Sequence, residues 1–134
     1  EVAKTNARDL GVSNIIFHKG SWCDGLPDLS FDLIVANPPY LSGSDSHLNE
    51  GGLQYEPRLA LAAKNFGYSE LNLIIRGSRK FLKKDSWLLL EHGYNQQDLL
   101  IKELNRFGYS DILGLKDYAN IDRVVAARWE VIDN

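Results

Sequence analysis

Hydrophobic positions along this chain fall into two patterns, short apolar runs and stretches with helical spacing. The runs at 15–17, 31–36 and 87–90 are bounded by polar and turn-forming residues, which is typical of strands buried in a sheet. Over 71–82 and 100–107, apolar residues recur every three or four positions, which predicts amphipathic helices. Strands that alternate with helices favour an α/β fold with a mostly parallel sheet and helices on both faces.

The expected helix ends rest on local chemistry. The chain opens inside a helical pattern that Gly11 is expected to end. Ser69 is a candidate cap for the helix over 71–82, and Lys83 and Lys84 suit the negative end of its dipole.

Two further regions complete the expected layout. A long polar loop over 41–55 is of a length that is usually functional or disordered, and Pro57 then suits the first turn of a helix that reaches Ala63. The last two apolar runs, 109–115 and 123–129, have too short a connection for a parallel crossover. We therefore expect them to pair antiparallel, which makes the sheet mixed.

Composition excludes several classes of protein. With 134 residues, 44% of them hydrophobic and 25% charged, the chain suits one globular domain. No apolar run approaches the roughly 20 residues that cross a membrane, and no signal-peptide pattern is present. The single cysteine, Cys23, excludes an internal disulfide framework and favours a cytoplasmic location. The net charge of −3 argues against a general nucleic-acid-binding surface.

Other candidate sites have ordinary explanations. The three histidines (His18, His47 and His92) lack metal-ligand spacing with each other or with Cys23, so no metal site is expected. Basic residues between Arg76 and Lys84 fit the solvated face and end of one helix better than a nucleic-acid site.

The clearest chemistry lies in Asn37-Pro38-Pro39-Tyr40, directly after the apolar run 31–36. Open α/β sheets bind ligands at the carboxyl ends of their strands. The Asn37 side chain offers a carbonyl acceptor, and the backbone carbonyl of Pro38 offers a second, whose direction Pro39 stiffens. Tyr40 brings an aromatic ring that can cover the face of a planar group.

Two acceptors about 3 Å from one planar amino group would take both of its hydrogens. The nitrogen lone pair would then point out of the plane, toward an electrophile. This suits methyl transfer onto an amide or aromatic amine, a poor nucleophile that gains mainly from orientation and electrostatic stabilisation. A rigid strand end without chemistry is the alternative interpretation of these four residues taken alone.

The tetrapeptide resembles the motif of S-adenosylmethionine-dependent amino-group methyltransferases, which have a Rossmann-like fold and act on adenine, guanine or protein glutamine. The wider sequence resembles one family in particular, the release factor glutamine methyltransferases (HemK/PrmC). The segments that carry this resemblance are Asp45, His47-Leu48, Glu56-Pro57, Leu59 to Leu61, Leu88 to Gly93, Asp117-Tyr118 and Arg123-Val124.

The resemblance implies transfer of a methyl group from S-adenosylmethionine to a glutamine side-chain amide. That glutamine belongs to the Gly-Gly-Gln loop of peptide chain release factors, which would be the protein partners. Asn37, Pro38 and Pro39 would bind the amide, with Tyr40 packing on it, and Asn37 would also lie beside the cofactor methyl group.

The resemblance also implies cofactor contacts, and this sequence differs from the family pattern at some of the positions involved. Trp22 matches the position that contacts the cofactor adenine, and Ser21 before it stands where family members often carry an acidic residue. No Gly-x-Gly turn occurs in the sequence. We expect residues 1–134 to be the latter part of the catalytic domain, without the glycine-rich cofactor loop, the first strands and the N-terminal helical substrate domain, and inactive alone.

Two other functions stay open. A nucleic-acid amino-group methyltransferase, acting on adenine or guanine, shares the motif, although the net acidity and the Glu-Pro and Glu-His-Gly segments argue against it. A non-catalytic binding fragment fits the missing glycine-rich turn. Neither a membrane nor direct nucleic-acid contact is expected.

Overall fold

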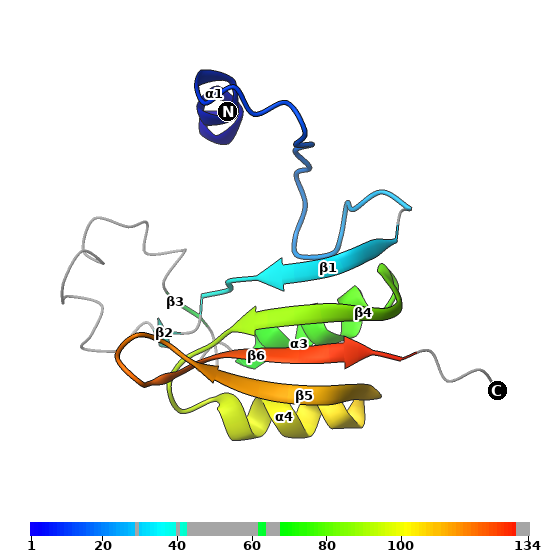
Figure 1. Ribbon diagram of the computed structural model, residues 1–134, viewed down its shortest axis with the longest axis vertical. Coiled ribbons are helices and arrows are strands. Elements are labelled where there is room, and N and C mark those ends of the chain that lie inside the picture. Colours follow the sequence, from blue (N-terminus) through cyan, green and yellow to red (C-terminus); the bar gives the residue numbers. More distant parts are fainter. Residues whose placement is uncertain (29, 40, 43–61, 64–67, 131–134) are drawn as a thin grey trace.

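The computed structural model of the protein describes residues 1–28, 30–39, 41–42, 62–63 and 68–130. In chain order its elements are α1 (Val2–Asp9), β1 (Phe31–Ala36), β2 (Leu41–Ser42), β3 (Ala62–Ala63), α3 (Tyr68–Ser78), β4 (Leu82–Glu91), α4 (Gln97–Arg106), β5 (Tyr109–Lys116) and β6 (Asp122–Trp129). Figure 1 shows β1, β4, β6 and β5 side by side, with α1 set apart at the other end of an extended segment. No helix in these ranges is long and apolar enough to cross a membrane.

The main sheet is mixed, as the sequence predicts, but among the described strands it is not mostly parallel. Its order is β1-β4-β6-β5, with β1 parallel to β4 and both other neighbouring pairs antiparallel. The last two strands form the expected antiparallel hairpin. This α/β arrangement is consistent with a truncated Rossmann-like fold. A separate pair, β2 and β3, is parallel.

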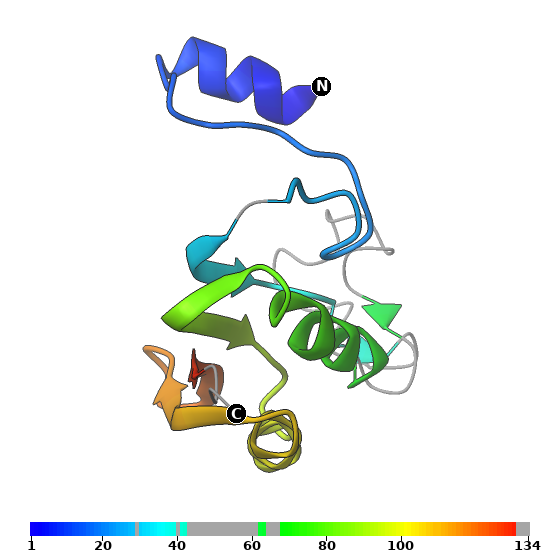
Figure 2. The ribbon, with the colours of Figure 1, turned by 90° about the vertical axis from the view of Figure 1, so that its right-hand side faces the viewer.

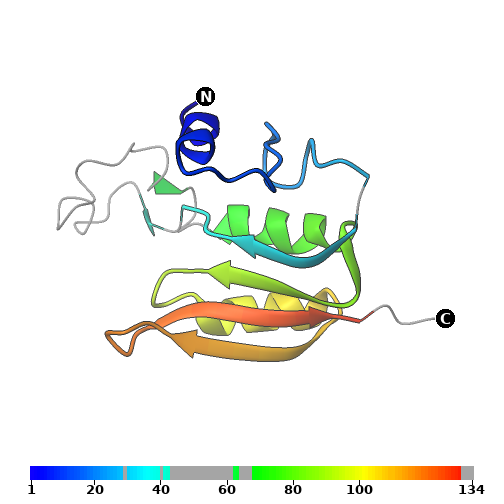
Figure 3. The ribbon, with the colours of Figure 1, turned by 45° about the horizontal axis from the view of Figure 1, so that its top comes forward.

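The core lies between the sheet and two helices on one of its faces. Figure 2, a view turned by 90°, shows α3 and α4 on the same side of the sheet, and Figure 3 shows both helices behind the strands. Fully buried side chains from both layers meet there: Leu71, Ile75, Leu88, Leu90, Leu100, Leu104 and Val125. The predicted helices on both faces are therefore not found within the described residues, where the packed helices occupy one face.

The prediction that β1 is a buried strand is wrong for the face of the sheet opposite the helices. The apolar run 31–36 does form a strand, but Leu33 is 50% exposed and Val35 is 66% exposed. β1 is the edge strand of these four, and no helix among the described residues covers its outward face. An apolar run predicts a strand, but it cannot show whether both faces of that strand are covered.

Three other expectations are corrected. The run 15–17 forms no strand, because no described strand pairs with it, and Ile16 is 79% exposed. Lys83 and Lys84 lie in β4 and not at a helix end, since α3 already ends at Ser78. In the predicted loop and helix, Leu41–Ser42 and Ala62–Ala63 instead pair as strands, so the loop does not begin at 41 and the helix does not include Ala63. Residues 43–55 and Pro57 lie outside the described residues.

The predicted helix stop at Gly11 is confirmed, and Gly108 ends α4 in the same way. Gly11 and Gly108 follow α1 and α4 with φ of +68° and +84°, backbone angles that glycine adopts without steric cost. Gly108 turns the chain directly into β5, which lays the final hairpin beside β4 and brings the carboxyl end of β4 close to the β5–β6 turn.

Candidate active site

The carboxyl end of β1 carries the predicted catalytic motif. Ala36 lies opposite Leu90 in the parallel pair, so Asn37 and Pro38 leave the sheet beside the last residues of β4. The Asn37 side chain is exposed, whereas the Pro38 side chain is almost fully buried and fixes the chain at this point. Pro39 is half-buried. Tyr40 lies outside the described residues, so its predicted packing stays a prediction.

A cavity connects the motif with the predicted cofactor residues. It has a volume of about 450 Å³ and runs along β1. Its lining residues come from β1, the 20s turn and α3: Trp22, Cys23, Leu26, Phe31, Leu33, Ile34, Val35, Ala36, Asn37 and Ile74. The cavity thus brings together Trp22 and Asn37, which are 15 positions apart in the sequence.

The shape and lining of this cavity suit a small ligand with a planar apolar part. Ligand sites commonly have volumes of about 300–1,000 Å³, with mostly apolar walls and a few placed polar groups. Here aliphatic and aromatic side chains form the walls, and Asn37 supplies an amide at one end. Ser21 precedes Trp22 with an exposed side chain, and its backbone carbonyl accepts a hydrogen bond from the Asp24 amide at 2.9 Å.

Trp22 is held by a partner that sequence reasoning missed. Its indole Nε1 donates to the Oε2 atom of Glu70, at 2.5 Å, on the first turn of α3. The Trp22 backbone has a φ of +51°, an uncommon value for a residue with a side chain. The two residues are 48 positions apart, and no periodicity in the sequence indicates that they meet.

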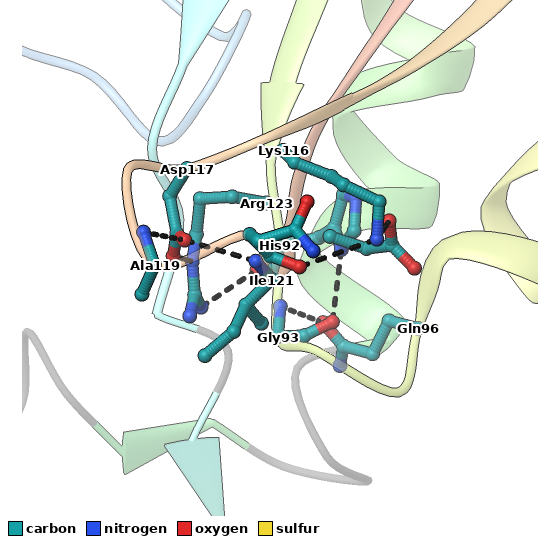
Figure 4. Close-up of polar contacts among 10 residues, drawn as sticks. His92, Gly93, Gln96, Lys116, Asp117, Ala119, Ile121 and Arg123 are labelled. Carbon is teal, nitrogen blue, oxygen red and sulfur yellow. Dashed lines mark hydrogen bonds and ion pairs between the residues drawn. The ribbon is translucent and has the colours of Figure 1, made fainter.

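The carboxyl end of β4 forms a buried hydrogen-bonded turn beside the motif (Figure 4). His92 is fully buried, and its Nδ1 lies 2.8 Å from the carbonyl oxygen of Gly93. Because a carbonyl only accepts, we infer that Nδ1 carries the proton of the neutral ring and that Nε2 is an acceptor. The Gly93 amide donates to Gln96 Oε1 at 2.8 Å, which joins this turn to the start of α4.

The β5–β6 hairpin braces the same turn. Arg123 Nη1 donates to the His92 carbonyl at 3.2 Å, and the His92 amide donates to the Arg123 carbonyl at 2.9 Å. Asp117 accepts from Arg123 Nε at 3.2 Å and from the amides of Ala119 and Ile121 (Figure 4). These hydrogen bonds fix the end of β4 from two sides and give His92 and Gly93 a structural role there.

The electrostatics of this edge follow from burial and hydrogen bonding. Burial lowers the pKa of His92, which favours the neutral ring. Hydrogen bonds from the Ile121 amide, and then from the Arg123 side chain, lower the pKa of Asp117. Burial raises the pKa of the Cys23 thiol, so the cavity wall presents a neutral sulfur and not an activated thiolate.

The basic residues near α3 are engaged within the fold. The Arg79 guanidinium lies 4.9 Å from the centre of the Trp129 ring, and that of Arg76 lies 5.9 Å from the centre of the Phe107 ring. Lys83 Nζ pairs with Asp32 at 2.8 Å. Of the cluster interpreted as the face and end of one helix, Arg76 lies on α3, whereas Arg79 follows that helix and Lys83 lies in β4.

Comparison with known proteins supports the resemblance. No protein-family model matches the chain. A release factor glutamine methyltransferase from Aliivibrio fischeri is 41% identical over 136 aligned residues, which span 100% of this chain and 47% of that protein. Proteins of the same name from Yersinia pestis and Coxiella burnetii are 39% and 38% identical, over 97% and 96% of the chain and 47% and 46% of their own lengths.

The similarity of this chain to a solved structure is weaker than its similarity to these sequences. The crystal structure of a release factor-specific protein-(glutamine-N5) methyltransferase from Alicyclobacillus acidocaldarius is 24% identical, with a TM-score of 0.46 over 76% of this chain and 50% of that one. The resemblance expected from the sequence is nevertheless confirmed by the sequence relatives: this chain is related over its whole length to the release factor glutamine methyltransferases, and it spans about half the length of the curated relatives that it matches.

Proposed function

We propose that this chain provides the amide-binding motif and part of the cofactor pocket of a protein-glutamine N-methyltransferase that acts on peptide chain release factors. The observation that carries the proposal is the shared cavity. Trp22, predicted to contact the cofactor, and Asn37, predicted to contact both cofactor and substrate, line the same space along β1. The names and similarity of the relatives support the same substrate class.

The types of side chain that line the cavity suit S-adenosylmethionine. The Trp22 ring and the aliphatic side chains of β1 offer apolar surface for an adenine, while the Asn37 amide offers hydrogen-bonding groups at the far end of the cavity. Bound there, the cofactor would supply an electrophilic methyl group on a positively charged sulfur. In the proposal, Trp22 and Asn37 hold it, with Ser21 beside the adenine end.

The motif would act on the glutamine amide by orientation. The Asn37 side-chain oxygen and the Pro38 carbonyl each accept one N–H of the amide, which turns the nitrogen lone pair toward the methyl group. Methyl transfer would form the new N–C bond while the sulfur–methyl bond breaks and its electron pair stays on sulfur as a neutral thioether. Positive charge would develop on the nitrogen, and both carbonyl dipoles would stabilise it. The nitrogen then releases one proton to solvent. Tyr40 would cover the amide from one face.

The burial of Pro38 supports the proposed orienting role of the motif. Two acceptors can select one planar geometry only if their directions are held, and Pro38 is anchored beside a turn that Arg123 and Gln96 brace. The cytoplasm, where release factors act, would be the working compartment. The domain assignment, residues 1–134 as the latter part of a catalytic domain, is part of the same proposal.

Labelled methyl transfer tests the function. The full-length protein is incubated with methyl-labelled S-adenosylmethionine and a release factor, its Gln→Ala loop variant, or DNA or RNA. We expect label in the release factor and none in the loop variant. Label in nucleic acid but not in the release factor would support the alternative amino-group methyltransferase, and no label in any acceptor would support a non-catalytic binding fragment.

A further inference from the structure

The aromatic wall of the cavity is anchored on α3 at two points. The first is the hydrogen bond from the Trp22 indole to the Glu70 carboxylate, at 2.5 Å. A hydrogen bond to a charged acceptor is roughly twice as strong as a neutral one. Trp22 also lies in a turn with a φ of +51°, so its ring direction depends on what holds that turn in place.

The second anchor is a close contact between the next residue of the turn and the same helix. A Cβ atom added to Gly77 would lie 3.0 Å from the Cys23 Cβ and 3.1 Å from its Sγ. The Cys23 side chain therefore packs where another residue of α3 would carry its own side chain. Glu70 and Gly77 are seven positions apart, close to two helical turns, so both lie on one face of α3.

We propose that Glu70 is a positioning residue that fixes the Trp22 indole as the aromatic wall of the cavity, with Gly77 as the second anchor that lets the turn approach α3. The ligand class served by this wall is a purine nucleoside, because a fixed indole ring offers a flat apolar surface for stacking. This inference rests on the proposed function, in which the cavity holds the adenine of the cofactor.

The contact itself is tested in the free chain. In a ¹⁵N-labelled sample, Trp22→Phe assigns the Trp22 indole N–H signal among the three tryptophans. Glu70→Gln is expected to shift this signal upfield, because the charged acceptor is replaced by a weaker neutral one, while the signals of Trp87 and Trp129 stay. A Trp22 signal that does not move would overturn the proposal.

The consequence for binding is tested by titrating the full-length protein and its variants with S-adenosylhomocysteine to millimolar concentration. We expect Glu70→Ala to raise the Kd about fivefold or more, the loss of one charge-assisted hydrogen bond, with Glu70→Gln in between. Gly77→Ala is expected to raise the Kd as well, because its methyl group displaces Cys23. The matched control is Glu103→Gln, which changes a half-buried carboxylate that accepts from Asn72 at 3.1 Å and does not line the cavity.

The outcomes separate the two claims. If the unmodified full-length protein does not bind the ligand, the cofactor role of the cavity fails, and the positioning role fails with it. If the unmodified protein binds and Glu70→Ala binds equally well, only the positioning role is overturned. A loss in Glu103→Gln as large as in Glu70→Gln would indicate a general effect of carboxylates that contact α3 and would also overturn it.

Discussion

The phenol of Tyr109 donates a hydrogen bond to the backbone carbonyl of Ile75, 3.0 Å away, and so joins β5 to α3 inside the core. The Ser78 hydroxyl lies 2.9 Å from the same phenol oxygen. All three residues are buried, so each of these polar groups depends on its partner inside the protein. The junction holds α3, which forms part of the cavity, against the last hairpin.

Removal of this hydroxyl is expected to destabilise the fold while the packing is kept. Tyr109→Phe retains the ring that lies 5.2 Å from the Trp129 ring, but leaves buried polar groups short of a partner. We expect the free energy of unfolding in urea to fall by about 1–2 kcal/mol. Tyr118→Phe is the control, because Tyr118 is fully exposed and should change the free energy by less than about 0.5 kcal/mol.

The same tyrosine predicts a loss of stability in alkali. Burial raises the pKa of Tyr109 to about 12, above its ordinary value of 10.0. The folded protein therefore keeps this proton while the unfolded chain loses it, so the stabilisation is full below pH 10 and disappears as the pH rises toward 12. Urea unfolding between these pH values should show a smaller loss in Tyr109→Phe than in the unmodified chain. An equal loss in both would contradict this assignment.

His92 predicts the opposite dependence, on the acid side. Burial lowers its pKa below the ordinary 6.5, so the folded state holds the ring neutral while the unfolded chain takes up a proton as the pH falls. Stability is thus present above pH 6.5 and is lost as the pH falls through the lower pKa of the folded state. The unfolding midpoint should therefore drop between pH 7.5 and pH 5.

Two histidine variants separate the contribution of His92 to this loss of stability from that of other groups. His92→Gln removes the titrating group and should flatten the drop, even though its stability at pH 7.5 is lower. His18→Gln changes an exposed histidine and should leave the drop unchanged. If His92→Gln loses as much stability toward acid as the unmodified chain does, another group is responsible.

The two faces of the sheet predict unequal costs for the same substitution. Leu88 is fully buried against the helices, so Leu88→Ala should cost about 2–5 kcal/mol of unfolding free energy. Leu113 is 53% exposed on the hairpin, and Leu113→Ala should cost less than about 1 kcal/mol. Thermal and urea unfolding of both variants measures the difference. Similar costs would show that the outward face of the sheet is also packed.

Local signals in the sequence predicted much of this fold, since each depends on neighbours along the chain. Gly108 ends α4 because glycine alone adopts its backbone angle without cost, and a short connection makes β5 and β6 antiparallel. The motif at Asn37 was found because it follows a strand that an apolar run predicts. These features need no knowledge of distant residues.

The missed features all depend on contacts between distant residues. Leu33 and Val35 are exposed because no described element covers that face of the edge strand, which periodicity does not reveal. The Glu70 carboxylate accepts a hydrogen bond from an indole 48 positions away, which no local pattern around Glu70 indicates. Tertiary pairing likewise places Lys83 in a strand beside Asp32, although its sequence context suggested a helix end.

The central claim is that Asn37 holds the glutamine amide at the end of β1. Asn37→Ala removes the side-chain acceptor from an exposed position, so the fold should survive, with unchanged circular dichroism and unfolding midpoint. Asn105→Ala, an exposed asparagine on α4 whose side chain donates to the Ile101 carbonyl, is the matched control.

The measurement that tests this claim most directly is the rate of methyl transfer from labelled cofactor to a release factor, catalysed by the full-length protein and by each variant. We predict a fall of about 100-fold or more in Asn37→Ala, the usual size of an electrostatic contribution from one placed group, and a normal rate in Asn105→Ala. A near-normal rate in a folded Asn37→Ala protein would contradict the account and leave the motif as a rigid strand end.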